Sequence, residues 1–136
     1  MKALRSIAFV LALAAAGCSH GDNSTPTTPS VPTTTDTFTG TVTVRGSDMH
    51  TFTVSQSGQV SVTLTAVSPP GIPVGVGIGT PANSICGLLA GASVTTAAGT
   101  TAQLTGLVSP GMLCVAVFDV GNQTGPVSYT VTVVHP

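Results

Sequence analysis

Few side chains in this 136-residue chain could carry out chemistry, and the first to consider is a histidine close to a carboxylate. His50 follows Asp48 by two positions, so a carboxylate could orient an imidazole for acid–base work in a small hydrolase. The other carboxylates are Asp22, Asp36 and Asp119, and the chain contains no glutamate. Asp36, Asp48 and Asp119 lie at or beside predicted turns, where an aspartate usually accepts backbone hydrogen bonds. No serine lies in a Gly-x-Ser-x-Gly motif, which a serine hydrolase of the common kind would need. We therefore expect no catalytic residue and interpret His50 as an ordinary strand histidine packed beside Phe52. A hydrolase that uses His50 and Asp48 is kept as the alternative.

The three cysteines suggest covalent modification rather than catalysis or metal binding. If Cys18 is modified separately, Cys86 and Cys114 remain as an even pair, which in an oxidising compartment predicts one disulfide. The chain has no Cys-x-x-Cys motif. We expect His20 in a solvated amino-terminal segment and His135 at a frayed carboxyl-terminal end, so both are weak candidate ligands. We expect no metal site and no cofactor.

The amino-terminal segment has the features of a secretory signal. Lys2 and Arg5 precede an apolar run of ten residues, Ile7–Ala16. Such a run is too short to cross a membrane as a permanent helix, but it suits the central region of a signal peptide. An ordinary Ala-x-Ala cleavage at residues 14–16 would release a plainly secreted protein.

Residues 15–18 read Ala-Ala-Gly-Cys and resemble the lipobox of bacterial lipoproteins, although Ala15 stands where leucine is commoner. The resemblance implies a signal peptide at residues 1–17 and a lipid on Cys18, which would become the first residue. Ser19, rather than aspartate, follows the cysteine and favours the outer membrane over the inner one. The expected location is therefore the outer membrane or the cell surface, with the membrane contacted through the amino-terminal lipid.

Beyond residue 17 the chain is almost uncharged. Arg45 is the one arginine and no lysine occurs there, against four aspartates. A single base cannot neutralise a row of phosphates, so nucleic acid is excluded as a partner. Residues 18–37 are rich in Thr, Pro and Ser and contain one branched aliphatic residue, Val31. This composition cannot form a core, and it predicts a solvated tether.

Residues 38–136 have the composition and periodicity of a β-domain. Val, Ile and Thr supply 36 of these 99 residues, and β-branched residues favour strands. Apolar residues alternate at Val60, Val62, Leu64 and Ala66, and the period of two recurs at residues 38–44, 50–54 and 127–133. Turns rich in Gly and Pro separate these segments. The pattern predicts seven to eight short strands in an antiparallel two-sheet β-sandwich, jelly-roll-like in outline.

Some residues in this domain predict local packing. Residues 112–119 are apolar on both faces, which is typical of a central, covered strand. Gly75, Gly77 and Gly79 leave one face of a strand bare, so a neighbouring side chain could approach closely or the sheet could bend. The four aromatic residues of the domain fit inward positions by alternation, and eight threonines fit outward ones. The aromatic residues are Phe38, Phe52, Phe118 and Tyr129.

Three segments of the domain resemble the bacterial pre-peptidase C-terminal domain family: residues 46–54, residues 57–64, and residues 111–117 with 125–131. Met49-His50 departs from the acidic and aromatic pair that is common there, and Met112-Leu113-Cys114 replaces a Thr-Tyr-rich segment. The resemblance implies a jelly-roll-like β-sandwich that accompanies secreted enzymes without catalysing a reaction. The acidic cluster that binds calcium in some relatives has no match here.

The sequence therefore predicts a non-catalytic, envelope-anchored accessory or binding module for a protein or polysaccharide surface. The alternatives are the small hydrolase already described and a structural coat module that self-associates through its sheet edges.

Overall fold

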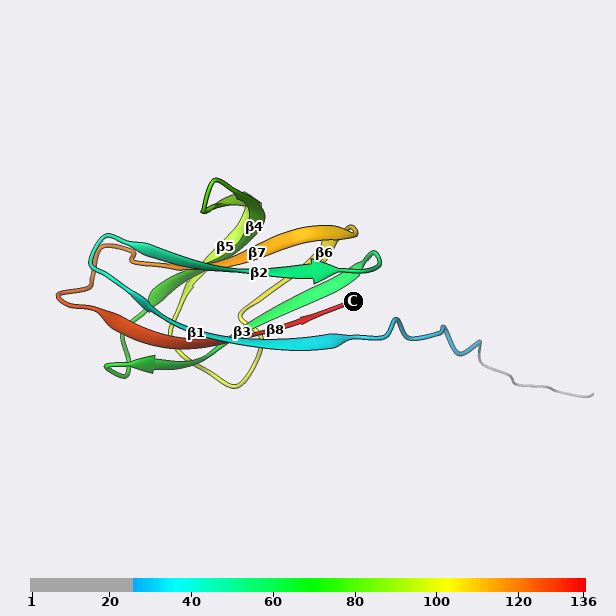
Figure 1. Ribbon diagram of the computed structural model, residues 1–136. Helices are drawn as coiled ribbons and strands as arrows, with labels where there is room; N and C mark the ends of the chain where they lie inside the picture. The colour runs from blue at the N-terminus through cyan, green and yellow to red at the C-terminus, as the bar shows by residue number, and fades with distance from the viewer. Residues whose placement is uncertain (1–25) are drawn as a thin grey trace, which may run out of the picture.

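The computed structural model describes residues 26–136, so the predicted signal peptide and the proposed lipid site Cys18 lie outside the described residues. The described residues form eight strands in two antiparallel four-stranded sheets, which confirms the predicted β-sandwich (Figure 1). The strands are β1 (Thr34–Val42), β2 (Ser47–Val54), β3 (Gly58–Ser68), β4 (Val74–Ala82), β5 (Ile85–Thr96), β6 (Leu104–Val108), β7 (Gly111–Phe118) and β8 (Val127–His135). Within residues 26–136, no helix is long and apolar enough to cross a membrane.

The two sheets have the strand orders β1-β8-β3-β6 and β2-β7-β4-β5, and they face each other across one apolar core. Alternate residues of β8 point inward, as predicted, and the same holds for the middle of β3. Each valine buried in this way contributes about 1.5 to 3 kcal/mol relative to an exposed one. The largest fully buried side chains are Leu64, Val42, Val54, Val60, Val62, Val74, Val76, Val115, Val117, Val127, Val131 and Val133.

Strand β1 begins at Thr34, four residues before the predicted start of the domain. Thr34–Thr37 therefore pair with β8 instead of belonging to the tether, and Thr34 lies opposite His135. The chain enters the domain at the same end at which β8 finishes (Figure 1). Strand β7 lies between β2 and β4, as its two apolar faces predicted.

A bulge in β3 overturns one predicted inward position. The register with β8 shifts between Leu64 and Ala66, so Val67 is buried and Ala66 is exposed. The side chain of Gln103 completes the hydrogen bonding here, because its Oε1 accepts from the Leu64 N–H at 2.8 Å and its Nε2 donates to the Leu64 carbonyl at 3.3 Å. The side-chain amide of Gln103, which directly precedes β6, thus takes the place of one backbone pairing with β3.

Asp119 holds two loops together at the end of the sandwich remote from Thr34. Its Oδ2 accepts from the Arg45 N–H at 2.7 Å, and its Oδ1 accepts from the N–H groups of Gly121 at 2.8 Å and Asn122 at 3.2 Å. This confirms the interpretation of Asp119 as a turn residue that accepts backbone hydrogen bonds. The hydrogen bond from Arg45, followed by those from the β7–β8 loop, lowers the pKa of Asp119 below its usual 3.8.

Asp119→Asn is expected to destabilise the fold in a pH-dependent way. The folded-state pKa is depressed, so the stabilisation by the carboxylate is complete above the unfolded-state value of 3.8 and disappears as the pH falls through the folded-state value. Urea unfolding midpoints of the two proteins, measured from neutral pH down to about pH 2, should converge in acid. A difference that stays constant over this range would contradict the assignment.

Candidate functional site

Alternation along β2 directs its side chains to two different places. Ser47 and Met49 lie on the outer face of their sheet, whereas Asp48 and His50 lie at the seam where the edge strands β1 and β2 of the two sheets meet. The seam and the outer face are therefore two candidate sites that share strand β2, and Asp48 borders both of them.

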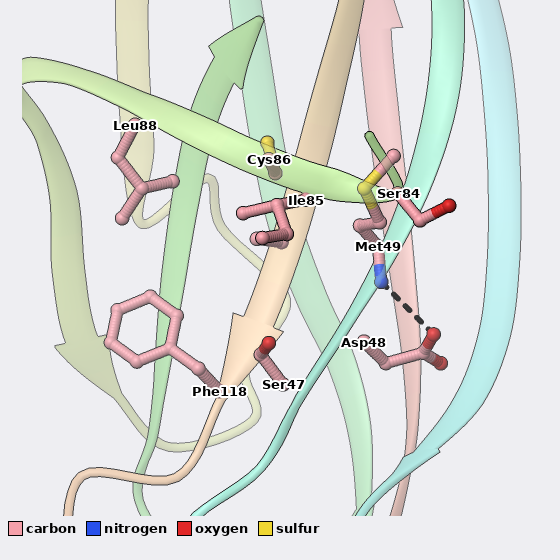
Figure 2. A pocket seen from close by; sticks show the side chains of 9 residues that line it. Ser47, Asp48, Met49, Ser84, Ile85, Cys86, Leu88 and Phe118 are labelled. Carbon is pink, nitrogen blue, oxygen red and sulfur yellow. Dashed lines mark hydrogen bonds between the residues drawn. The ribbon is translucent and has the colours of Figure 1, made fainter. Parts of the chain in front are cut away.

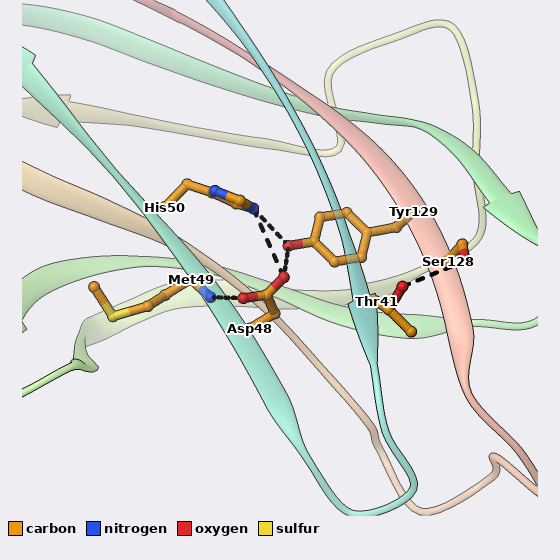
Figure 3. Close-up of polar contacts among 6 residues, drawn as sticks. All are labelled: Thr41, Asp48, Met49, His50, Ser128 and Tyr129. Carbon is orange, nitrogen blue, oxygen red and sulfur yellow. Dashed lines mark hydrogen bonds and ion pairs between the residues drawn. The ribbon is translucent and has the colours of Figure 1, made fainter.

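At the seam, Tyr129 of β8 joins the two residues of the hydrolase hypothesis (Figure 3). Its hydroxyl donates to Asp48 Oδ2 at 2.8 Å and lies 2.9 Å from His50 Nε2. Since the phenol has one proton and gives it to the carboxylate, its oxygen accepts from an Nε2–H of His50. The imidazole and carboxylate themselves are 3.8 Å apart. The structure thus brings together Asp48 and His50, but through Tyr129, for which the alternation of β8 predicts only a place in the core.

Residues on β1 shape this network. The Phe38 ring stacks on the imidazole of His50 with ring centroids 4.8 Å apart, and the Tyr129 ring meets the same imidazole edge-on. The prediction that His50 packs beside Phe52 is wrong, because the Phe52 ring packs on His135 instead. Gly40 lies under the network, and a Cβ at that position would collide with Asp48 Oδ2 and the Tyr129 hydroxyl. The absence of a side chain at Gly40 is what allows this hydroxyl and carboxylate to meet.

The phenol of Tyr129 stays protonated at the seam. Burial, followed by the hydrogen bond to Asp48 and its negative charge, raises the pKa of Tyr129, so the phenol stays neutral and keeps donating to the carboxylate. Asp48 also accepts from the Met49 N–H at 2.9 Å. Among residues 26–136, the hydrogen-bond partners of Asp48 and His50 include no serine, threonine or cysteine side chain that could act as a nucleophile.

His135 forms a second histidine–carboxylate pair, and its predicted place at a frayed chain end is wrong. The side chain is buried, its Nε2 lies 3.0 Å from Asp36 Oδ2, and its Nδ1 lies 3.2 Å from the Pro136 carbonyl oxygen. The Phe52 ring packs on it with centroids 5.0 Å apart. Asp36 also lies within β1 rather than at a turn, so the pair fixes the first residues of β1 to the end of β8.

The predicted disulfide between Cys86 and Cys114 is present, and it joins strands that are not neighbours. Cys86 belongs to β5 and Cys114 to β7, with β4 between them. In a flat sheet, such residues would be about 9.6 Å apart, yet their Cα atoms are separated by 5.8 Å. The tip of the β4–β5 hairpin must therefore fold over the outer face of the sheet, where it stands above the two layers in Figure 1.

The three alternating glycines of β4 make this fold-over possible, which confirms the interpretation of close approach. A Cβ on Gly75 would enter the Phe118 ring, and one on Gly77 would meet the Leu88 side chain. At Gly79 the obstacle is the backbone of Gly87, in the folded-over part of β5. The register between β4 and β5 shifts at the same place, between Gly77 and Gly79.

A groove of about 260 Å³ lies between the folded-over hairpin and β2 (Figure 2). Met49, Ile85, Leu88 and Phe118 supply most of its apolar wall; Ser47 and Ser84 add hydroxyl groups, and Asp48, Cys86 and Ala116 complete the lining. The predicted inward position of Phe118 is wrong, because its buried neighbour Val117 faces the core and Phe118 faces the groove. His50 does not line the groove.

Residues 26–136 contain no group of three or more His, Cys, Asp or Glu side chains that could hold a metal ion. No protein-family model matches this chain, and no curated protein matches it either.

Proposed function

We propose that this chain is a non-catalytic binding module of the bacterial envelope, an accessory domain of the pre-peptidase C-terminal type. In this proposal the signal peptide ends at residue 17, a lipid on Cys18 anchors the chain at the outer membrane or cell surface, and the following segment acts as a tether. The lipobox-like residues 15–18 support the anchor. The disulfide is compatible with an extracytoplasmic location.

The observation that carries the binding function is the chemistry of the groove on the outer face. An aromatic ring, Phe118, lies beside serine hydroxyls in a shallow, weakly charged depression. A sugar ring has an apolar face that packs on an aromatic ring and hydroxyl groups that bond to Ser47 and Ser84. The sequence predicts that the partner is a protein surface or a polysaccharide surface. Of these two, the chemistry of the groove favours a polysaccharide.

Binding to insoluble neutral polysaccharides tests this proposal. The chain carrying Cys18→Ser, which cannot be lipidated, is mixed with chitin, cellulose or β-glucan particles, and the bound fraction is measured after sedimentation. Ser47→Arg places a long side chain in the groove and should weaken binding about tenfold or more. Thr51→Arg is the matched control, because Thr51 is an exposed residue on the same face of β2 outside the groove.

Retention on at least one polysaccharide that Ser47→Arg abolishes and Thr51→Arg preserves would support the proposal. No retention on any of the three, or equal loss in both variants, would reject it. The hydrolase alternative has a separate readout. His50 does not line the groove, so His50→Ala should leave retention unchanged, and it would matter only if the chain degraded one of the three polymers.

A further inference from the structure

The hairpin tip, residues 79–88, forms one wall of the groove and has few polar links to the rest of the sandwich. Backbone pairing of β4 with β7 ends at Gly79. Within residues 26–136, no ion pair reaches residues 81–92, and no hydrogen bond joins them to anything outside their own hairpin. The disulfide from Cys86 to Cys114 therefore supplies the covalent tie where hydrogen bonds are lacking.

Apolar contact adds little to this tie. Ile85 is 67% exposed, and Leu88 and Leu89 are each about two-fifths exposed. Residues 89–92 are out of register with β4, and Gly91 among them has a φ of 71°. A short hairpin with little buried surface and an interrupted ladder is the kind of element that opens locally while the rest of a domain stays folded.

The burial of Cys114 shows what the tip covers. Alternation along β7 directs Leu113 and Val115 into the core and Cys114 to the outer face of the sheet. Met112, two positions earlier on that outer face, is 60% exposed, whereas Cys114 has no exposed surface. The folded-over tip is thus what buries Cys114, and lifting the tip would uncover it.

We propose that the disulfide is a redox-sensitive lock on the groove: when it is reduced, the hairpin tip lifts from the outer face and the groove loses one wall. This inference rests on the proposed function, because it gives a means of regulating the site at which the polysaccharide binds. The tip contributes about half of the groove lining (Figure 2), namely Ser84, Ile85, Cys86 and Leu88.

The reductant is a dithiol, and Cys86 is the sulfur it can reach, since Cys86 lines the groove while Cys114 is fully buried. A thiolate of the dithiol attacks Cys86 Sγ and forms a mixed disulfide. The bond to Cys114 Sγ breaks, and Cys114 leaves as a thiolate that takes a proton from water. The second thiol of the reductant then attacks the reductant sulfur of the mixed disulfide and releases Cys86 as a thiolate. The protein disulfide gains two electrons, and the dithiol is oxidised to its own disulfide.

Thiol labelling of the folded protein tests whether the tip lifts. The chain carrying Cys18→Ser and Cys86→Ala keeps Cys114 as its single thiol. The matched control carries Cys18→Ser, Cys86→Ala, Cys114→Ala and Val115→Cys, so that its single thiol faces the core from the next position of β7. A maleimide should label Cys114 at least tenfold faster than the control thiol, because the tip opens more often than the two sheets separate.

Equal labelling rates would overturn the lock. The urea dependence of Cys114 labelling decides the question if the control variant does not fold. Labelling through a lifted tip should change little with urea below the unfolding transition, whereas labelling through global unfolding rises steeply and would contradict the proposal.

Dithiothreitol, a small dithiol, tests the redox step on the Cys18→Ser chain. Loss of the disulfide, followed by alkylation and mass measurement, should also proceed at a rate that changes little with urea below the transition. A steep rise with urea would show that the reductant reaches the sulfur only in the unfolded chain, and would overturn this step.

Retention on a polysaccharide that the oxidised chain binds should fall about tenfold on reduction, and unchanged retention would overturn the regulation of binding. If no polysaccharide is retained at all, the proposed function fails, while the labelling rates still decide whether the disulfide holds the tip down.

Discussion

Replacing both Cys86 and Cys114 by alanine should lower the free energy of unfolding by about 3.6 kcal/mol, because the unfolded chain regains the entropy of an open loop. The two cysteines are 28 positions apart, and this length sets the estimate. A domain of this size has a total stability of about 5 to 10 kcal/mol, so the variant should be close to half-unfolded under mild heating. The loss should also exceed the cost of other single contacts, because the hairpin tip would no longer be held over β7.

Urea unfolding of both proteins, with and without dithiothreitol, measures this effect. The reductant should shift the midpoint of the parent protein toward that of the alanine pair and leave the alanine pair unchanged. Equal midpoints for parent and variant without reductant would show that the disulfide does not stabilise the fold.

Gly79→Ala is expected to cost about 3 kcal/mol, which is large for the addition of one methyl group. The new Cβ would meet the backbone of Gly87, which cannot rotate aside as a side chain would. The hairpin tip would have to lift, while the disulfide to Cys114 pulls it down. Gly106→Ala is the matched control in β6, where a Cβ meets nothing within 4 Å, and it should change stability by less than about 0.5 kcal/mol.

A double-mutant cycle separates the two contributions to this cost. If the disulfide holds the hairpin against Gly79, the penalty of Gly79→Ala should shrink in the background that lacks both cysteines, because the tip is then free to rise. An unchanged penalty would mean that the clash is relieved elsewhere, and the fold-over would not depend on the disulfide.

The fold class was predictable because the chain repeats one simple pattern. Residues two apart on a strand face the same way, so the alternating valines of β8 and β3 determine which faces meet in the core. The disulfide was predictable because Cys86 and Cys114 are the only two cysteines that follow Cys18 in the sequence, and an even pair favours one bond. The same alternation, applied to Val117, places Phe118 on the outer face, so the signal for this groove residue was in the sequence.

Other features depend on contacts between distant residues, which periodicity does not encode. The bulge after Leu64 is completed by an amide 39 positions away, on Gln103. The seam needs Gly40, Asp48 and Tyr129 from three different strands in two sheets. The pairing of Asp36 with His135 links residues 99 positions apart, and their separation made His135 look like a frayed end.

The side-by-side alignment of β1 and β8 has a mechanical consequence. All nine residues of β1 pair in unbroken register with β8, and the chain joins β1 at Thr34. A pull on the preceding segment, opposed by a load at the Asp119 loops, is directed along the strand axis. All the backbone hydrogen bonds between β1 and β8 then resist the force at once. The two strands separate only if these bonds break together rather than one after another.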